Sequence, residues 1–176
     1  MERIQVRFRV HTANAVPTAE GAIQIAMEQT DVTLHGLRAL VIGYGRIGSI
    51  LAAKLAALGV LVTVSARSCR DTARIEAAGL QSADTRHLTD VLSDFPLVFN
   101  TVPAAVLGAA ELSKLPPKAL IIDLASQPGG IDLSAVPPDG VRVIHALSLP
   151  GKVAPVTASI AVRDTIYAIL SEEGIL

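Results

Sequence analysis

The sequence of 176 residues predicts one α/β domain, a doubly wound parallel sheet with flanking helices at its N- and C-terminal ends. Two observations predict this fold class. Short aliphatic runs alternate along the chain with segments of helical periodicity, a pattern typical of consecutive βαβ units. The apolar residues are also mostly aliphatic, with 27 Ala, 21 Leu, 18 Val and 15 Ile, whereas only 3% of all residues are aromatic. Val and Ile favour buried strands, and Ala and Leu favour helices packed on them.

The first 31 residues are predicted to form a strand and a linker helix. Residues 4–10 alternate apolar with charged or polar side chains, so one face of this strand would lie in water. A helix is predicted from Pro17 to Gln29, because proline suits the first turn and Glu20 complements the positive end of the helix. A single half-buried strand needs a partner, and none is adjacent in sequence.

Residues 32–150 are predicted to form the main domain. The predicted strands are 39–43, 60–66, 80–84, 96–101, 119–125 and 141–146, and the predicted helices are 47–58, 70–78, 89–92 and 104–112. Gly59 and Gly79 end the first two helices. Up to six strands with right-handed crossovers fit a Rossmann-type doubly wound sheet. Residues 151–176 form the last unit, whose helix over 154–170 is predicted to pack back on the linker helix.

Composition and charge exclude several classes of protein. A formal net charge of -1 gives no electrostatic reason to expect nucleic acid or an anionic membrane surface. The longest uncharged stretch, 95–110, is broken by prolines and is too short to span a bilayer, and residues 1–10 lack the apolar core of a signal peptide. Cys69 is the single cysteine, which favours a reducing, cytoplasmic setting. The four histidines lack the spacing of metal ligands, so no metal site is expected.

The strongest motif is a Gly-Tyr-Gly-Arg-Ile-Gly turn that begins at Gly43, directly after an apolar strand and before a helix. In a dinucleotide-binding turn Gly43 makes the tight turn, Gly45 lets the backbone approach a pyrophosphate, and Gly48 lets the helix pack closely on the strand. The amino end of the helix would offer its N–H groups and positive dipole to the phosphates. Arg46 and Ile47 belong to the same turn, and Arg46 either reaches the phosphates or is solvated. The alternative is a structural turn that binds nothing.

The end of the second strand predicts NADP rather than NAD. An NAD site usually has an acidic residue about 20 positions past the glycines, which binds the ribose 2′-OH. The sequence has Ser65, Arg67 and Ser68 there, and its next carboxylate is that of Asp71. Arg67 can pair with a 2′-phosphate and stack on the adenine, and the serines can donate hydrogen bonds to the phosphate. Arg70 is a second candidate cation, and the alternative is that Arg67 is only a surface charge.

Three further strand ends carry polar or tightly turning residues, at 100–103, 125–130 and 149–155. Ligands of open α/β sheets bind beyond the carboxyl ends of the strands, so three such ends on one edge favour a site there. Each of them alone would be interpreted as a plain turn. His145 is interpreted as a structural residue rather than a base, and Asp123 as a residue that caps a turn or orients Ser126.

The combination of motifs resembles the dipicolinate synthase family, specifically the first of its two subunits. The segments that carry the resemblance are PTAEGAI, VIGYGRIG, VTVSARS, FNTVPA, LIIDLASQPGG and LPGKVAPVTA, all between residues 14 and 168. The resemblance implies an NAD(P)-dependent oxidation of a dihydrodipicolinate-type precursor to dipicolinate in sporulation, with a second, flavoprotein-like subunit of dipicolinate synthase in the mother-cell cytoplasm. It also implies three groups of cofactor-binding residues: Gly43, Gly45, Arg46, Ile47 and Gly48 on the pyrophosphate; Ser65, Arg67 and Ser68 on the adenosine side; and Thr101, Val102, Pro103 and Ser126 at the nicotinamide.

The chain departs from this resemblance at its start. Family members have a whole N-terminal domain before the PTAEG helix, whereas 16 residues precede Pro17, so we expect 1–31 to be the remnant of a missing domain. The catalytic cleft of such two-domain dehydrogenases lies between the domains. A wider resemblance is to 2-hydroxyacid dehydrogenases, which use an Arg after the fifth strand and a Glu–His pair. Gln127 stands where that Arg would be sought and no such pair is evident, which counts against a simple hydroxy acid as substrate.

For the reaction we expect a cyclic imine dicarboxylate that loses a hydride to the nicotinamide while a base removes a proton. Glu20 is the candidate base or orienting group, and Lys152 would pair with a substrate carboxylate, with Thr18, Gly130 and Gly151 bordering the substrate. Glu20 fits a helix-end charge without a chemical role equally well. The alternatives are a non-catalytic NADP-binding or scaffolding subunit, and an NADP-dependent reductase of an imine or keto acid. Exposed apolar helix faces predict a homo-oligomer.

Overall fold

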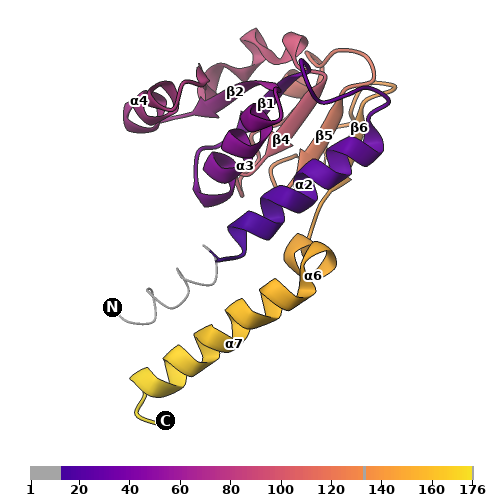
Figure 1. The fold of residues 1–176 in the computed structure, drawn as a ribbon. Coiled ribbons are helices and arrows are strands. Elements are labelled where there is room, and N and C mark those ends of the chain that lie inside the picture. Colours follow the sequence, from indigo (N-terminus) through magenta and orange to yellow (C-terminus); the bar gives the residue numbers. More distant parts are fainter. Residues whose placement is uncertain (1–12, 133, 176) are drawn as a thin grey trace.

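The computed structural model describes residues 13–132 and 134–175, so the strand predicted over 4–10 lies outside the described residues. Within these ranges six parallel strands form one sheet (Figure 1). The strands are β1 (Arg38–Ile42), β2 (Leu61–Ala66), β3 (Gln81–Asp84), β4 (Leu97–Asn100), β5 (Leu120–Asp123) and β6 (Arg142–His145). Their order, β3-β2-β1-β4-β5-β6, is that of a Rossmann sheet and confirms the predicted fold class.

Helices cover both faces of the sheet. They are α2 (Ala15–Gln29), α3 (Arg46–Ala57), α4 (Cys69–Ala77), the 3-10 helices η1 (Thr85–Asp90) and η2 (Leu92–Asp94), α5 (Ala109–Leu112), α6 (Leu149–Val153) and α7 (Pro155–Glu172). Side chains of the central strands β1, β4 and β5 alternate between two cores: Val41 of β1 packs with α2 and α3, whereas Leu40 packs with η1, η2 and α5. This alternation explains why β1, β4 and β5 are mostly apolar along their length, since both of their faces are buried.

The helix predicted over 104–112 is wrong in its first half, since only α5 is helical. The N–H groups of Val106 and Leu107 both donate to the carbonyl oxygen of Gly130, at 2.9 and 3.0 Å, and Leu107 forms a β-bridge with Ile131. The Leu107 side chain is buried in the core on that face. Pairing with the distant loop around Gly130 therefore overrides the helix propensity of an alanine-rich segment.

A five-residue helix, α6, occupies the segment that the sequence presented as a turn after the last strand. It packs against α2 at Gly21, where a Cβ would lie 3.0 Å from Val153 and 3.3 Å from Leu149. The predicted C-terminal helix is present as α7, which continues from α6 away from the sheet (Figure 1). The division into units at residues 31 and 150 stays a prediction.

Candidate functional site

A pocket of about 750 Å³ lies at the carboxyl ends of β1, β2, β4 and β5. Its lining comprises Gly43, Tyr44, Gly45, Arg46, Ile47, Ala66, Arg67, Ser68, Asp71, Arg74, Thr85, Thr101, Val102, Pro103, Leu124, Ala125 and Ser126. The strand order reverses between β1 and β4, so the pocket lies at the point where open α/β sheets bind their ligands.

The glycine turn between β1 and α3 forms one wall of the pocket. Gly43 has a φ of +96°, and a Cβ there would lie 2.7 Å from Oγ1 of Thr101. A Cβ on Gly48 would overlap the carbonyl oxygen of Gly43, whereas a Cβ on Gly45 would meet no atom within 4 Å. Close packing inside the protein therefore requires glycine at positions 43 and 48. Of the three glycines of this turn, Gly45 is the one that borders open space.

The amino end of α3 begins at this open space. Gly45 is the N-cap residue of α3, and among the described residues no side chain caps this end. The N–H groups of the first helical turn and the positive end of the helix dipole are suited to an anion such as a phosphate. The open space at Gly45 is the room that such a group needs, so the turn fits the pyrophosphate of a dinucleotide.

Another part of the lining is a cluster of charged and polar side chains on α4 and at its N-cap. The hydroxyl of Ser68 donates to Oδ2 of Asp71 at 2.8 Å, and Nη1 of Arg74 lies 3.0 Å from Oδ1 of the same carboxylate. The Arg74 guanidinium also lies over the ring of Tyr44, 5.2 Å from its centre. The hydrogen bond from Ser68, assisted by Arg74, lowers the pKa of Asp71 from its usual value.

A buried polar network holds the loops after β4 and β5. Asn100 donates from Nδ2 to Oδ1 of Asp123 at 2.8 Å and to the carbonyl oxygen of Val102 at 3.0 Å. Asp123 also accepts from the N–H of Ala125 at 3.2 Å and from that of Gly130 at 3.1 Å. Asp123 thus caps the turn as the sequence predicts, and it fixes loops that carry lining residues of the pocket.

His145 extends this network toward solvent. Its Nδ1 lies 3.4 Å from Oδ2 of Asp123, and its own side chain is about half exposed. The contact gives His145 an orienting partner inside the fold, which agrees with the interpretation of this histidine as structural.

Ten of the twelve residues predicted to bind the cofactor line this single pocket. The other two, Gly48 and Ser65, lie beneath it. Ser65 is fully buried, its hydroxyl accepts a hydrogen bond from Thr85 at 3.1 Å, and its carbonyl oxygen accepts one from the N–H of Gly43 at 2.9 Å. The structure therefore gives Ser65 a contact with the glycine turn and with Thr85, a lining residue.

The residues predicted for catalysis and substrate binding lie elsewhere. Nζ of Lys54 lies 2.9 Å from Oε1 of Glu20, a pair that joins α3 to α2. Thr18 is buried and donates to the carbonyl oxygen of Asn14 at 2.6 Å. Gly151 and Lys152 are exposed on α6, and a Cβ on Gly130 would overlap the amide of Asn100. None of the five predicted residues lines the pocket, and their roles stay predictions.

Among the Asp, Arg, Ser and Thr residues that line the pocket, sequence reasoning missed Arg74 and Thr85 and gave no role to Asp71. Of the two arginines on α4, it considered Arg70, whereas Arg74 is the one that lines the pocket. A signal was present: a Ser-x-x-Asp pattern marks a helix start, and an Arg three residues after the Asp lies on the same helix face.

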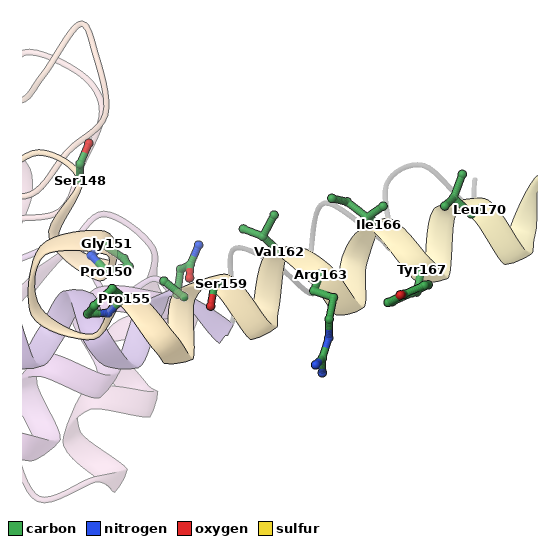
Figure 2. A pocket seen from close by; sticks show the side chains of 12 residues that line it. Ser148, Pro150, Gly151, Pro155, Ser159, Val162, Arg163, Ile166, Tyr167 and Leu170 are labelled. Carbon is green, nitrogen blue, oxygen red and sulfur yellow. The ribbon is translucent and has the colours of Figure 1, made fainter.

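A second hollow, of about 900 Å³, lies along α7 and beside α6. Figure 2 shows Val162, Ile166 and Leu170 on one side of α7, with Arg163 and Tyr167 on the other. In the described part of the chain no helix is both long and apolar enough to span a bilayer. In the same residues no cluster of three His, Cys, Asp or Glu side chains is arranged to bind a metal.

Known proteins resemble this chain in sequence and in structure. Over 159 residues it is 41% identical to the first subunit of dipicolinate synthase of Bacillus subtilis (strain 168), covering 90% of this chain and 54% of that protein. The crystal structure of the same subunit from Bacillus halodurans has a TM-score of 0.88 at 38% identity, covering 92% of this chain and 56% of that one. The corresponding Bacillus subtilis structure has a TM-score of 0.88 at 40% identity, and the match covers 93% of this chain and 55% of that one.

The predicted resemblance to the first subunit of dipicolinate synthase is thereby confirmed, and the chain spans about half the length of these relatives. Residues 8–128 match the family described as D-isomer specific 2-hydroxyacid dehydrogenase, NAD binding domain. This match covers more than half of the chain and includes the glycine turn and the ends of β1, β2, β4 and β5. The chain therefore belongs to the family of NAD-binding domains of D-isomer specific 2-hydroxyacid dehydrogenases.

Proposed function

We propose that this chain is the NADP-binding part of an oxidoreductase of the dipicolinate synthase type. The family supports a dehydrogenase-type role with a nicotinamide cofactor. The observation that carries the proposal is the pocket at the β1/β4 switch point, which is open at Gly45 and is also lined by Arg67 and Arg74. One wall suits a pyrophosphate and the other suits a further anionic group.

The preference for NADP rests on the charges at the end of β2. Arg67, Ser68 and Arg74 line the pocket there, and guanidinium and hydroxyl groups are good donors to a phosphate. Asp71 is the first carboxylate after this strand in the sequence, and it is already paired with Arg74. Directly after β2 the chain has Arg67 in place of the acidic residue that would accept a hydrogen bond from a ribose 2′-OH. An arginine at this position favours a 2′-phosphate.

The proposed substrate is a dihydrodipicolinate-type cyclic dicarboxylate, which becomes aromatic on oxidation. Thr101, Val102 and Ser126 line the part of the pocket that would hold the nicotinamide, and this group would serve as the hydride acceptor. The role of the chain in this step is to hold the cofactor at the glycine turn and to keep the loops after β4 and β5 in place through Asn100 and Asp123. Lys152 is proposed to bind a substrate carboxylate and Glu20 to take the proton, which requires Glu20 to leave Lys54.

The proposal includes a partner. The Bacillus subtilis relative is named as one subunit of dipicolinate synthase, which implies a second subunit in that protein. We propose that this chain likewise acts in the cytoplasm with a second, flavoprotein-like subunit. Self-association is also part of the proposal, supported by the exposed apolar residues of α7, such as Ile160 and Ile166.

A non-catalytic NADP-binding subunit is the second candidate function. One observation favours it: Glu20 and Lys152 both lie outside the pocket, so the residues proposed for proton transfer and substrate binding do not converge on it. A mixture of the chain with the flavoprotein-like subunit would separate the candidates, because dipicolinate formation requires the first and NADPH binding without turnover indicates the second. An imine or keto-acid reductase would instead turn over in a panel of such substrates.

Titration of the purified chain with NADPH and NADH, followed by nucleotide fluorescence, tests the proposed function. We expect NADPH to bind more tightly than NADH, and Arg67→Ala to weaken NADPH roughly tenfold, since a charged hydrogen bond to phosphate is lost. Arg163→Ala on α7, where the guanidinium pairs with Asp164, is the matched control and should leave both affinities unchanged. Failure of the native chain to bind either nucleotide would overturn the proposed function.

A further inference from the structure

The carboxylate of Asp71 occupies two candidate phosphate donors of the pocket, Ser68 and Arg74. Ser68 donates its hydroxyl to Oδ2 at 2.8 Å, and Arg74 places Nη1 3.0 Å from Oδ1. All three residues line the pocket, next to Arg67. An anion of the chain itself is therefore bound where the proposed function places an anion of the cofactor.

The position of Arg74 is fixed from two sides. Its guanidinium pairs with Asp71 on α4 and lies over the ring of Tyr44, which belongs to the glycine turn. The arginine thus connects α4 with the glycine turn, and both ends of this connection line the pocket. A guanidinium held in this way loses little conformational freedom when another acceptor replaces the carboxylate.

We propose that Asp71 sets the cofactor preference of this pocket: its carboxylate stands in for the 2′-phosphate on Ser68 and Arg74, and NADP binds by displacing it from them. The inference rests on the proposed function and deepens it. A phosphate monoester has more charge and more acceptor oxygens than one carboxylate, so it can displace the Asp71 carboxylate from Ser68 and Arg74. The displaced carboxylate still repels the phosphate, and this repulsion reduces the preference for NADP.

A purely structural role predicts something different. Ser68 is the N-cap of α4, and its hydroxyl oxygen accepts from the N–H of Asp71 at 3.1 Å, so the Ser68–Asp71 pair also stabilises the helix start. Loss of that role would lower the melting temperature and weaken the binding of NADPH and NADH to the same extent. A change in the ratio of the two affinities is the readout that a cap alone cannot produce.

The test measures dissociation constants of NADPH and NADH for the native chain, Asp71→Asn and Arg74→Gln, together with the melting temperature of each. We expect Asp71→Asn to tighten the binding of NADPH roughly tenfold and to change the affinity for NADH by less than about threefold. The reason is that only NADPH carries the 2′-phosphate, which the lost negative charge of Asp71 repels. Arg74→Gln should weaken NADPH roughly tenfold and leave NADH nearly unchanged. Adenosine 2′-monophosphate should compete better than adenosine 5′-monophosphate, and more so in Asp71→Asn.

The matched control is Asp94→Asn, since Asp94 pairs with Arg38 at 2.9 Å in a similarly exposed position outside the pocket. It should leave both affinities unchanged. A weakening of NADH with no gain for NADPH in Asp71→Asn would show that the carboxylate binds a ribose hydroxyl, and would overturn the inference. An equal change for both nucleotides would overturn it in favour of the helix cap. Absence of binding by the native chain would be a failure of the proposed function itself, and the inference would fall with it.

Discussion

Asn100 donates a hydrogen bond from Nδ2 to Oδ1 of Asp123 at 2.8 Å, and both side chains are buried. The contact joins the carboxyl ends of β4 and β5. Through the same two side chains the backbone of Val102, Ala125 and Gly130 is held in place. Two loops that line the pocket therefore depend on one buried pair.

Removal of Asp123 should destabilise the fold strongly. Asp123→Ala leaves one N–H of the buried Asn100 amide and the backbone N–H groups of Ala125 and Gly130 without their acceptor, and each such group costs about 1–3 kcal/mol. Because water and relaxation recover part of the loss, we expect the free energy of unfolding to fall by about 2–4 kcal/mol in urea denaturation. Asp94→Ala, which breaks an exposed pair with Arg38, should cost at most about 1 kcal/mol. Equal losses in the two variants would contradict the importance of the network.

Two glycines of the same turn should respond in opposite ways to alanine. Gly45→Ala adds a Cβ that meets no protein atom within 4 Å, so the melting temperature should change little while NADPH binding falls roughly tenfold. Gly48→Ala overlaps the carbonyl oxygen of Gly43 and should cost about 1–3 kcal/mol of stability, because helix and strand must move apart. Thermal melts and nucleotide titration of both variants check this. Unimpaired NADPH binding by Gly45→Ala would show that no phosphate approaches the turn.

The sequence was sufficient for those parts of the site that depend on local spacing. Glycines at fixed offsets after an aliphatic strand predict the turn at Gly43, and polar residues at the end of β2 predict Arg67 and Ser68. Arg74 could not be placed in this way, because its position depends on the approach of α4 to Tyr44. The helix predicted over 104–112 failed for a similar reason, since a loop distant in sequence supplies its backbone partner.

Acid should remove the stabilisation that the Asp84–Arg86 pair provides. The hydrogen bond from Arg86 lowers the pKa of Asp84 from 3.8 to about 2. Because the pKa of Asp84 is lower in the folded than in the unfolded state, its contribution to the stability of the fold is fully present above pH 3.8. This contribution disappears as the pH falls toward 2. Asp84→Asn should therefore have a slightly lower melting temperature than the native chain near pH 6, and the gap should close on acidification. The difference in melting temperature between Arg86→Gln and the native chain should shrink with falling pH in the same way. A difference that stays constant down to about pH 2 would show that the Asp84–Arg86 pair does not cause it.

The apolar side of α7 should decide the oligomeric state. Val162 and Ile166 are 47% and 51% exposed, and they lie with Leu170 on one side of the helix at intervals of four residues (Figure 2). Such a stripe is stable in water only when another surface covers it, so we expect Ile166→Glu to shift the chain toward the monomer in sedimentation velocity runs. Arg163→Glu is the control, since it introduces a carboxylate on the opposite side of the same helix. Monomers at every concentration of the native chain would contradict self-association, and an equal shift by both variants would assign the effect to net charge instead of the stripe.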